Sequence, residues 1–196
     1  MPKAGRWDLT AMNHDEITKL TDQYGGNWGI RHAERLLHLV PILAEGREYN
    51  EEAVWLAAYL HDWGGYAPFY NPEVQHYDRS VEVVEPFLTE RDCPEDLKAL
   101  VIECIANHHG GDPNRSIESR LLADADALDL LGVVGAARTF AMNARDIKGG
   151  YDWVKKWRER CLAAITLPKT TELAAVRVRE TDEFLRAFEE ETFGLF

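Results

Sequence analysis

Apolar side chains recur at helical spacing along most of the chain. The pattern is clearest over residues 36–43, where positions i, i+3, i+4 and i+7 are apolar, and it predicts a helix that begins near Trp28. Pro41 falls inside this pattern, and we expect it to kink or end the helix because proline lacks a backbone N–H. No segment shows the sustained apolar–polar alternation that a half-buried strand requires.

Start and stop signals predict the remaining helices. Asn50 is a good N-cap for a helix that Gly64 and Gly65 end, and Pro94 suits the first position of another helix. Dense turn chemistry over residues 110–114 precedes Ser116, which caps a helix that stops near Gly132. Three more helical stretches are expected at 133–144, 153–165 and 171–190. The prediction is an all-α, compact multi-helix bundle of about seven to nine helices. We expect a single domain made of an N-terminal helical segment (1–27), a core (28–145) and C-terminal helices that complete the bundle (146–196).

Composition narrows the class of protein. The chain has 196 residues, and its net charge of −12 disfavours binding to nucleic acid polymers and to anionic membranes. Cys93, Cys104 and Cys161 form no Cys-x-x-Cys pair and are expected to be reduced and mostly buried. No apolar run approaches the length of a membrane span, so we expect a cytoplasmic protein.

Histidines and aspartates gather at the ends of the predicted helices. The elements concerned carry His32, the His61-Asp62 pair, His76, the His108-His109 pair and three aspartates at 124, 126 and 129. Each could be a buried polar residue or a helix cap when it is considered alone. Together they favour a metal site, because burying so many titratable groups in a helical core without a cation would be costly.

The three aspartates divide by their position around a helix. Asp124 and Asp126 lie about 200° apart, so they cannot both face one ion, whereas Asp126 and Asp129 share a face. Asp126 is therefore the predicted ligand and Asp129 its structural partner. For Asp124 we expect a helix-end interaction or a partly buried ion pair.

The order His32, His61-Asp62 and an aspartate within Ala-Asp-Ala-Asp-Ala-Leu-Asp resembles the HD-domain metal-dependent phosphohydrolases, in particular their small stand-alone bacterial members. Gly135 and Arg138 extend this resemblance, which covers roughly residues 28–138. It implies four ligands of a primary metal site, namely His32, His61, Asp62 and Asp126. It also implies that His76 and His108 bind a second ion that Asp62 bridges, with His109 able to replace or supplement His108.

This resemblance implies a function. The expected activity is hydrolysis of a phosphoester or phosphoanhydride of a nucleotide or small phosphorylated metabolite, with Asp62 and His61 as catalytic residues. One or two divalent ions (Mn, Fe, Co, Ni, Zn or Mg) are the expected cofactors. Candidate cations for gripping the substrate are Arg79, Arg31 and Arg115. A homodimer is possible.

One departure from the family pattern leaves alternatives open. Many relatives carry a lysine three residues after the aspartate of the His-Asp pair, and Gly65 stands there in this chain. A non-catalytic module that binds metal or nucleotide for regulation is therefore an alternative function. A di-iron oxygenase on the same scaffold is another.

Overall fold

The computed structural model describes residues 12–110 and 114–196, and within these ranges the chain forms eight α-helices and no strand. This confirms the predicted all-α fold class. The residues 1–11 of the expected N-terminal segment and 111–113 of the expected turn lie outside the described residues. The helices are α1 (His14–Ala44), α2 (Glu51–Leu60), α3 (His76–Thr89), α4 (Glu95–Ala106), α5 (Ile117–Leu130), α6 (Gly132–Met142), α7 (Ile147–Ala164) and α8 (Pro168–Glu191), with a short 3-10 helix η1 (Trp63–Gly65) between α2 and α3.

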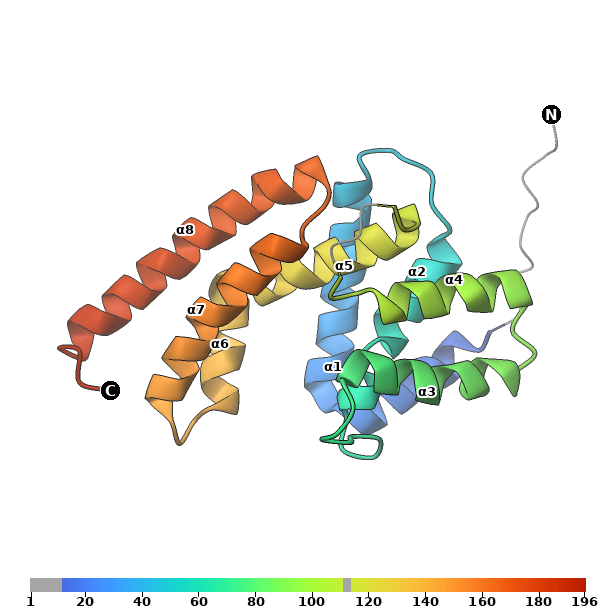
Figure 1. Cartoon of the computed structure of the whole chain (residues 1–196), viewed down its shortest axis with the longest axis horizontal. Coiled ribbons are helices and arrows are strands. Elements are labelled where there is room, and N and C mark those ends of the chain that lie inside the picture. The colour runs from blue at the N-terminus through green and yellow to red at the C-terminus, as the bar shows by residue number, and fades with distance from the viewer. Residues whose placement is uncertain (1–11, 111–113) are drawn as a thin grey trace.

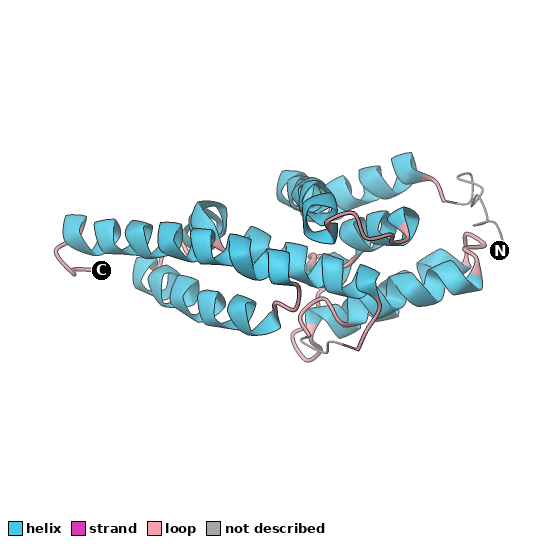
Figure 2. Ribbon diagram, turned by 90° about the horizontal axis from the view of Figure 1, so that it is seen from above, coloured by secondary structure: helices cyan, strands magenta, loops and turns pink. Residues whose placement is uncertain are grey.

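Helix α5 is the centre of the molecule. It packs against α1, α2 and α4 on one side and against α6, α7 and α8 on the other. Figures 1 and 2 show α6, α7 and α8 extending away from the α1–α4 group, with α5 joining the two parts. Almost every side chain of α5 is buried, including all three of its aspartates. Charged groups on a helix so enclosed need partners within the fold.

Polar side chains cap several helices as the sequence predicts. The side chain of Asn50 accepts a hydrogen bond from the backbone N–H of Ala53, and that of Ser116 accepts one from Ser119. Each bond satisfies one of the backbone N–H groups that a helix N-terminus leaves without a partner.

Helix α1 differs from its prediction in two ways. It begins at His14, well before Trp28, but Gly26 interrupts it with a φ of 62°, a left-handed conformation that glycine adopts without strain. Pro41 does not break the helix, which keeps helical dihedral angles there and continues to Ala44. A proline so close to the C-terminal end removes only one hydrogen bond, and its neighbours Val40 and Leu43 are buried in the core.

The C-terminal helices form a smaller apolar cluster of their own. Ala136, Tyr151, Val154 and Leu185 are buried there, and several phenylalanines pack around them. The three cysteines are free and buried, as expected. Within 12–110 and 114–196 no helix has the length and apolarity needed to cross a membrane.

Candidate metal centre

The first group of candidate ligands lies where α1, α2 and α5 meet. His32 comes from the middle of α1, His61 is the C-cap residue of α2, and Asp126 is on α5. The Nε2 atom of His32 lies 3.3 Å from Nε2 of His61 and 3.2 Å from Oδ1 of Asp126. Nε2 of His61 is 3.6 Å from an oxygen of Asp62. The four residues of the predicted primary site are therefore neighbours.

The second group joins three histidines. His76 begins α3, and His108 and His109 follow the end of α4. Nε2 of His76 lies 3.3 Å from Nε2 of His108 and 2.9 Å from Nε2 of His109. The structure thus places His109 beside His76 together with His108, so it supplements His108 in this cluster and does not replace it.

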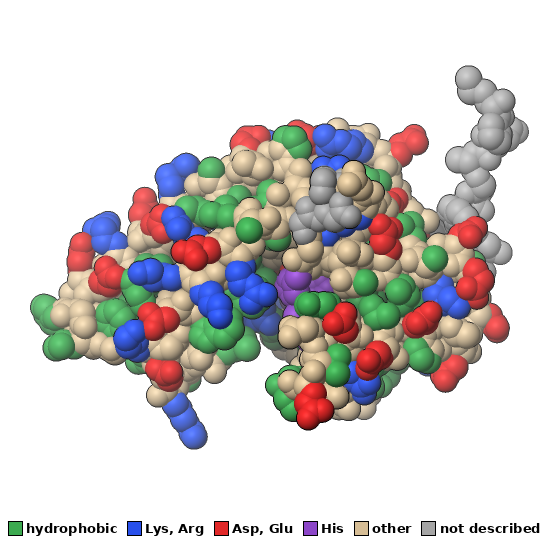
Figure 3. Space-filling view, viewed as in Figure 1, with side chains coloured by type: hydrophobic (Ala, Val, Ile, Leu, Met, Phe, Trp, Pro, Cys, Tyr) green, Lys and Arg blue, Asp and Glu red, His purple; other side chains and the backbone are tan. Residues whose placement is uncertain are grey.

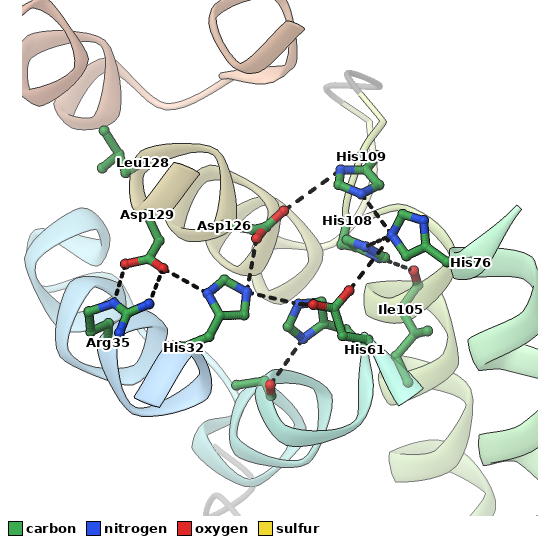
Figure 4. A network of polar contacts seen from close by, with 12 residues as sticks. His32, Arg35, His61, His76, Ile105, His108, His109, Asp126, Leu128 and Asp129 are labelled. Atoms are coloured by element: carbon green, nitrogen blue, oxygen red, sulfur yellow. Dashed lines mark hydrogen bonds and ion pairs between the residues drawn. The ribbon is translucent and has the colours of Figure 1, made fainter. Parts of the chain in front are cut away.

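Two carboxylates connect the groups. One oxygen of Asp62 faces His61, and the other lies 3.7 Å from Nε2 of His76. Asp126 behaves in the same way, since its second oxygen is 3.7 Å from Nδ1 of His109. Figure 4 shows Asp126 between His32 on one side and His109 on the other. Each carboxylate can therefore contribute one oxygen to each group.

Hydrogen bonds on the far side of the imidazoles fix their orientation. Nδ1 of His61 donates to the carbonyl oxygen of Ala58 at 3.0 Å, and Nδ1 of His108 donates to that of Ile105 at 2.6 Å. Nδ1 of His32 donates to Asp129 at 2.8 Å. With a proton held at Nδ1, Nε2 of each imidazole points into the cluster, which is the arrangement seen around histidine ligands of metals.

Arg35 completes the support of His32. Its guanidinium binds Asp129 through two hydrogen bonds, of 2.6 Å and 2.8 Å. Asp129 is thereby held between Arg35 and His32, in agreement with its predicted role as a structural partner. Arg35 was not among the predicted site residues, although its position three residues after His32 places both on one face of α1.

The donor atoms fit a divalent metal. Ligand atoms about 2.1 Å from one ion lie roughly 3.0–3.5 Å from one another, close to the nitrogen–nitrogen and nitrogen–oxygen distances within each group. Among the described residues, two sets of three donor atoms lie within 4.8 Å of one another, one from His32, His61 and Asp62 and one from His76, His108 and His109.

Protonation states also suit metal binding. Burial opposes ionisation of Asp62 and Asp126, but the nearby imidazoles outweigh it and hold both pKa values well below their usual range. Burial lowers the pKa values of His76, His108 and His109, so all three are neutral near pH 7. Burial would lower the pKa of His32 as well, yet its hydrogen bonds to Asp126 and Asp129 raise it to about 9. A metal ion must therefore displace a proton from His32.

The remaining polar candidates lie elsewhere. Asp124 is fully buried and accepts hydrogen bonds from the backbone N–H groups of Thr166 and Leu167, just before α8 begins. This is the helix-end interaction expected for it. His14 stacks on Trp55 and pairs with Glu52, away from the cluster.

A cavity of about 640 Å³ opens beside the ligand cluster. Asp62, His76, His109 and Asp126 form part of its wall. Figure 3 shows histidine side chains in a hollow of the surface, with Lys and Arg side chains gathered beside it. The rest of the wall is mainly apolar or aromatic and comes from α1, the loop after η1, and helices α5, α6 and α7: Gly25, Trp28, Gly65, Tyr66, Leu130, Arg138, Ala141, Met142 and Trp157.

The three arginines predicted to bind substrate do not line this cavity. Arg31 is exposed and pairs with Glu34 one turn along its own helix. Arg79 pairs with Glu82 and donates to the backbone of the loop before α3, and Arg115 donates to the carbonyl oxygen of Asn107. For Arg31 the reason is helix geometry, because a residue next to a ligand on a helix points about 100° away from it.

Arg138 is the arginine that the structure brings to the cavity. The sequence marks it only as part of the family motif, 12 residues after Asp126. Of the loop aromatics that follow the His-Asp pair, Tyr66 lines the cavity, whereas Trp63 is buried in the core and donates to Thr21.

Glycine at position 64 lets the site assemble. A Cβ atom there would lie 2.3–2.6 Å from backbone atoms of Ser80, His76 and Arg79. The close approach lets the backbone N–H of Gly64 donate to the hydroxyl of Ser80 at 2.9 Å. The same close approach places His76 beside Asp62.

Comparison with known proteins agrees with this geometry. The family model described as HD domain matches residues 29–131, more than half of the chain. Among solved structures, YpgQ of Bacillus subtilis in complex with ADP is 23% identical and superimposes with a TM-score of 0.66 over 90% of this chain and 93% of its own. An HD-superfamily hydrolase from Bacillus thuringiensis is 24% identical (TM-score 0.65, 90% of this chain and 95% of that one). A protein from Lactobacillus plantarum is 19% identical (TM-score 0.69, 93% and 99%). The family match over more than half of the chain leads to one conclusion: this chain belongs to the HD-domain family.

Proposed function

We propose that this protein is a divalent-metal-dependent phosphohydrolase that acts on a nucleotide or another small phosphorylated metabolite. The observation that carries the proposal is the convergence of five imidazoles and two carboxylates in one cluster at the wall of a cavity. Mixed imidazole and carboxylate ligation suits Mn, Fe, Co, Ni, Zn or Mg. A divalent ion in such a site supplies a Lewis acid for a phosphoryl oxygen and acidifies the attacking water.

The residues of the chain have distinct tasks in this proposal. His32, His61, Asp62 and Asp126 would hold one ion, and His76, His108 and His109 would hold a second with help from both carboxylates. Asp62 lies on the cavity wall and is anionic at neutral pH, so it can also accept a hydrogen bond from the attacking water and orient it. His61, almost fully buried and fixed by the Ala58 carbonyl, keeps Asp62 and the first ion in place.

The shape and chemistry of the cavity support a nucleotide-sized substrate. Its volume lies in the usual range for small-molecule sites. Trp28, Leu130 and Trp157 offer apolar and aromatic surface to a base or sugar, and the ligand cluster lies at the same cavity for the phosphate. The structure of YpgQ with ADP supports the same substrate class by analogy of fold.

The test is an activity panel with defined metal content. Protein stripped with EDTA and reloaded separately with Mn, Co, Ni, Mg, Fe or Zn is assayed for phosphate and pyrophosphate release from nucleotides and small phosphoesters. We expect turnover with at least one metal. We also expect Asp62→Asn to abolish it and to lower the metal content, while the exposed Asp22→Asn, a matched change on α1, leaves both unchanged.

The alternatives give different results in the same panel. Bound metal without turnover of any substrate would favour a regulatory binding module and refute the hydrolase. Oxygen consumption by the iron-loaded protein would favour the oxygenase.

A further inference from the structure

Arg138 on α6 is an unusual cation for a protein of this charge. The chain carries a net charge of −12, and most of its arginines in the described ranges pair with carboxylates or backbone carbonyls. Arg138 has no hydrogen bond and no carboxylate within 4.0 Å among the described residues. Its Nε atom is buried and has no partner.

The only strong contact of Arg138 within 12–110 and 114–196 is a stack on Trp28. The guanidinium carbon lies 4.4 Å from the centre of the indole ring, and both side chains line the cavity. Such stacking orients a guanidinium and leaves its N–H groups free at the edge. The terminal N–H groups of Arg138 are therefore available to a ligand.

Trp28 carries a second buried donor without a partner. Its Nε1 atom is shielded from solvent and makes no hydrogen bond in the described structure. Arginine and the indole N–H can donate but cannot accept, so they cannot satisfy each other. Buried donors usually have partners, and leaving one unsatisfied costs about 1–3 kcal/mol. Both atoms are closed to solvent, so a ligand in the cavity cannot reach them. The two terminal NH2 groups of Arg138 also lack a partner among the described residues but are not closed to solvent, and they are the donors that a ligand can meet.

We propose that the guanidinium of Arg138, held in place by its stack on Trp28, forms a binding subsite for an anionic oxygen group of the substrate, in particular a phosphate. This inference rests on the proposed function and adds a specific subsite to it. The carboxylates Asp62 and Asp126, on the same cavity wall, lie beyond ion-pair distance of Arg138. All three side chains line one cavity of about 640 Å³, which has room for a phosphate.

The position of Arg138 also accounts for the missing lysine at position 65. Gly65 lines the same cavity and offers no charge to the substrate. Arg138 is the only lysine or arginine among the described residues that line this cavity. A phosphorylated substrate is thus bound by a cation that comes from α6.

The experiment measures ADP binding directly, by calorimetry on protein loaded with Ca²⁺ and, separately, on metal-free protein. Arg138→Gln is compared with Arg138→Lys, with Trp28→Phe and with Arg186→Gln. Arg186→Gln removes one positive charge from an exposed ion pair with Glu190 and serves as the control. Trp28→Phe keeps an aromatic but smaller surface under the guanidinium, so it tests whether the stack positions Arg138.

We expect Arg138→Gln to weaken ADP binding by about ten- to hundredfold, as the loss of a charge-assisted hydrogen bond would. Arg138→Lys should recover part of the loss, and Trp28→Phe, which leaves a smaller ring under the guanidinium, should weaken binding by less than Arg138→Gln does. Urea denaturation and metal content should stay close to wild type for both Arg138 variants, which a purely structural role of the stack would not allow.

Other outcomes separate the subsite from the proposed function. Binding of ADP by Arg138→Gln within twofold of wild type would overturn the subsite, even if the wild type is an active hydrolase. If the wild type binds neither ADP nor inorganic pyrophosphate, the subsite is also overturned. Binding that depends on Arg138 in a protein without any turnover would support the subsite and refute the hydrolase.

Discussion

Asp124 and Asp126 are two residues apart on α5, and the structure assigns them different tasks. Asp124 is fully buried, and its two oxygens accept from the backbone N–H groups of Thr166 and Leu167 at distances of 2.8–3.2 Å. These groups precede α8, whose own N-cap residue, Leu167, has no capping side chain. Asp124 therefore caps α8 from a distance and fixes it on α5.

The change Asp124→Asn tests this assignment. In either orientation of the amide, its NH2 group faces one of the two backbone donors, and the negative charge is lost. Hydrogen bonds to a charged acceptor contribute about 1.5–3 kcal/mol and neutral ones about 1 kcal/mol, so we expect a loss of about 2–4 kcal/mol in the free energy of unfolding. That loss corresponds to a fall of about 1 M in the urea midpoint.

The assay is urea denaturation in EDTA together with metal analysis of the reloaded protein. Asp124→Asn should be destabilised but should keep the wild-type metal content, whereas Asp126→Asn should lose metal. Asp182→Asn, in an exposed ion pair with Arg158, is the matched control and should cost less than about 1 kcal/mol. A stability of Asp124→Asn within about 0.5 kcal/mol of wild type would refute the capping argument. Loss of metal in Asp124→Asn with retention in Asp126→Asn would reverse the assignment.

Three further predictions concern the cluster and its assembly. We expect two ions per chain. In a metal titration, His109→Gln should weaken binding of the second ion by at least about tenfold and leave binding of the first unchanged. Equal weakening of both ions would contradict two separate groups of ligands. Gly64→Ala should lower the free energy of unfolding in urea by about 1–3 kcal/mol and displace His76, because the added methyl group would overlap the start of α3. Gly65→Ala, whose Cβ would lie 3.6 Å from that of His76, should be tolerated. Equal stabilities of the two variants would show that the close approach at Gly64 is unimportant. In metal-free protein, the pKa of His32 is raised from 6.5 to about 9, so its protonated form stabilises the fold fully below pH 6.5, and up to about 3 kcal/mol is lost as the pH rises from there to about 9. A urea midpoint in EDTA that does not fall across this window would count against the ion pairs of His32.

Sequence patterns predicted correctly those features that depend only on a short stretch of chain. The apolar spacing predicted an all-α fold, and the caps at Asn50 and Ser116 form as expected. The angular argument on α5 separated Asp124 from the pair Asp126 and Asp129, because the turn of a helix fixes the directions of neighbouring side chains regardless of the surrounding fold. The order of histidines and aspartates was enough to indicate the family.

The assembled site depended on contacts that no local pattern contains. The convergence of α1, α2 and α5 gave Asp62 and Asp126 a position between two groups of imidazoles. The same assembly left Arg31 and Arg79 on the outside in surface pairs and brought Arg138 from α6 to the cavity.

The sequence by itself therefore determined the helices, the residue types of the metal centre and the family. Only the tertiary structure decided which donors lie close enough to share an ion, which aspartate binds the backbone before α8 and which arginine lines the cavity. The physical reason is range: helix formation and side-chain direction depend on residues within a few positions, whereas a shared metal site and a cavity depend on the packing of helices that are far apart in the chain.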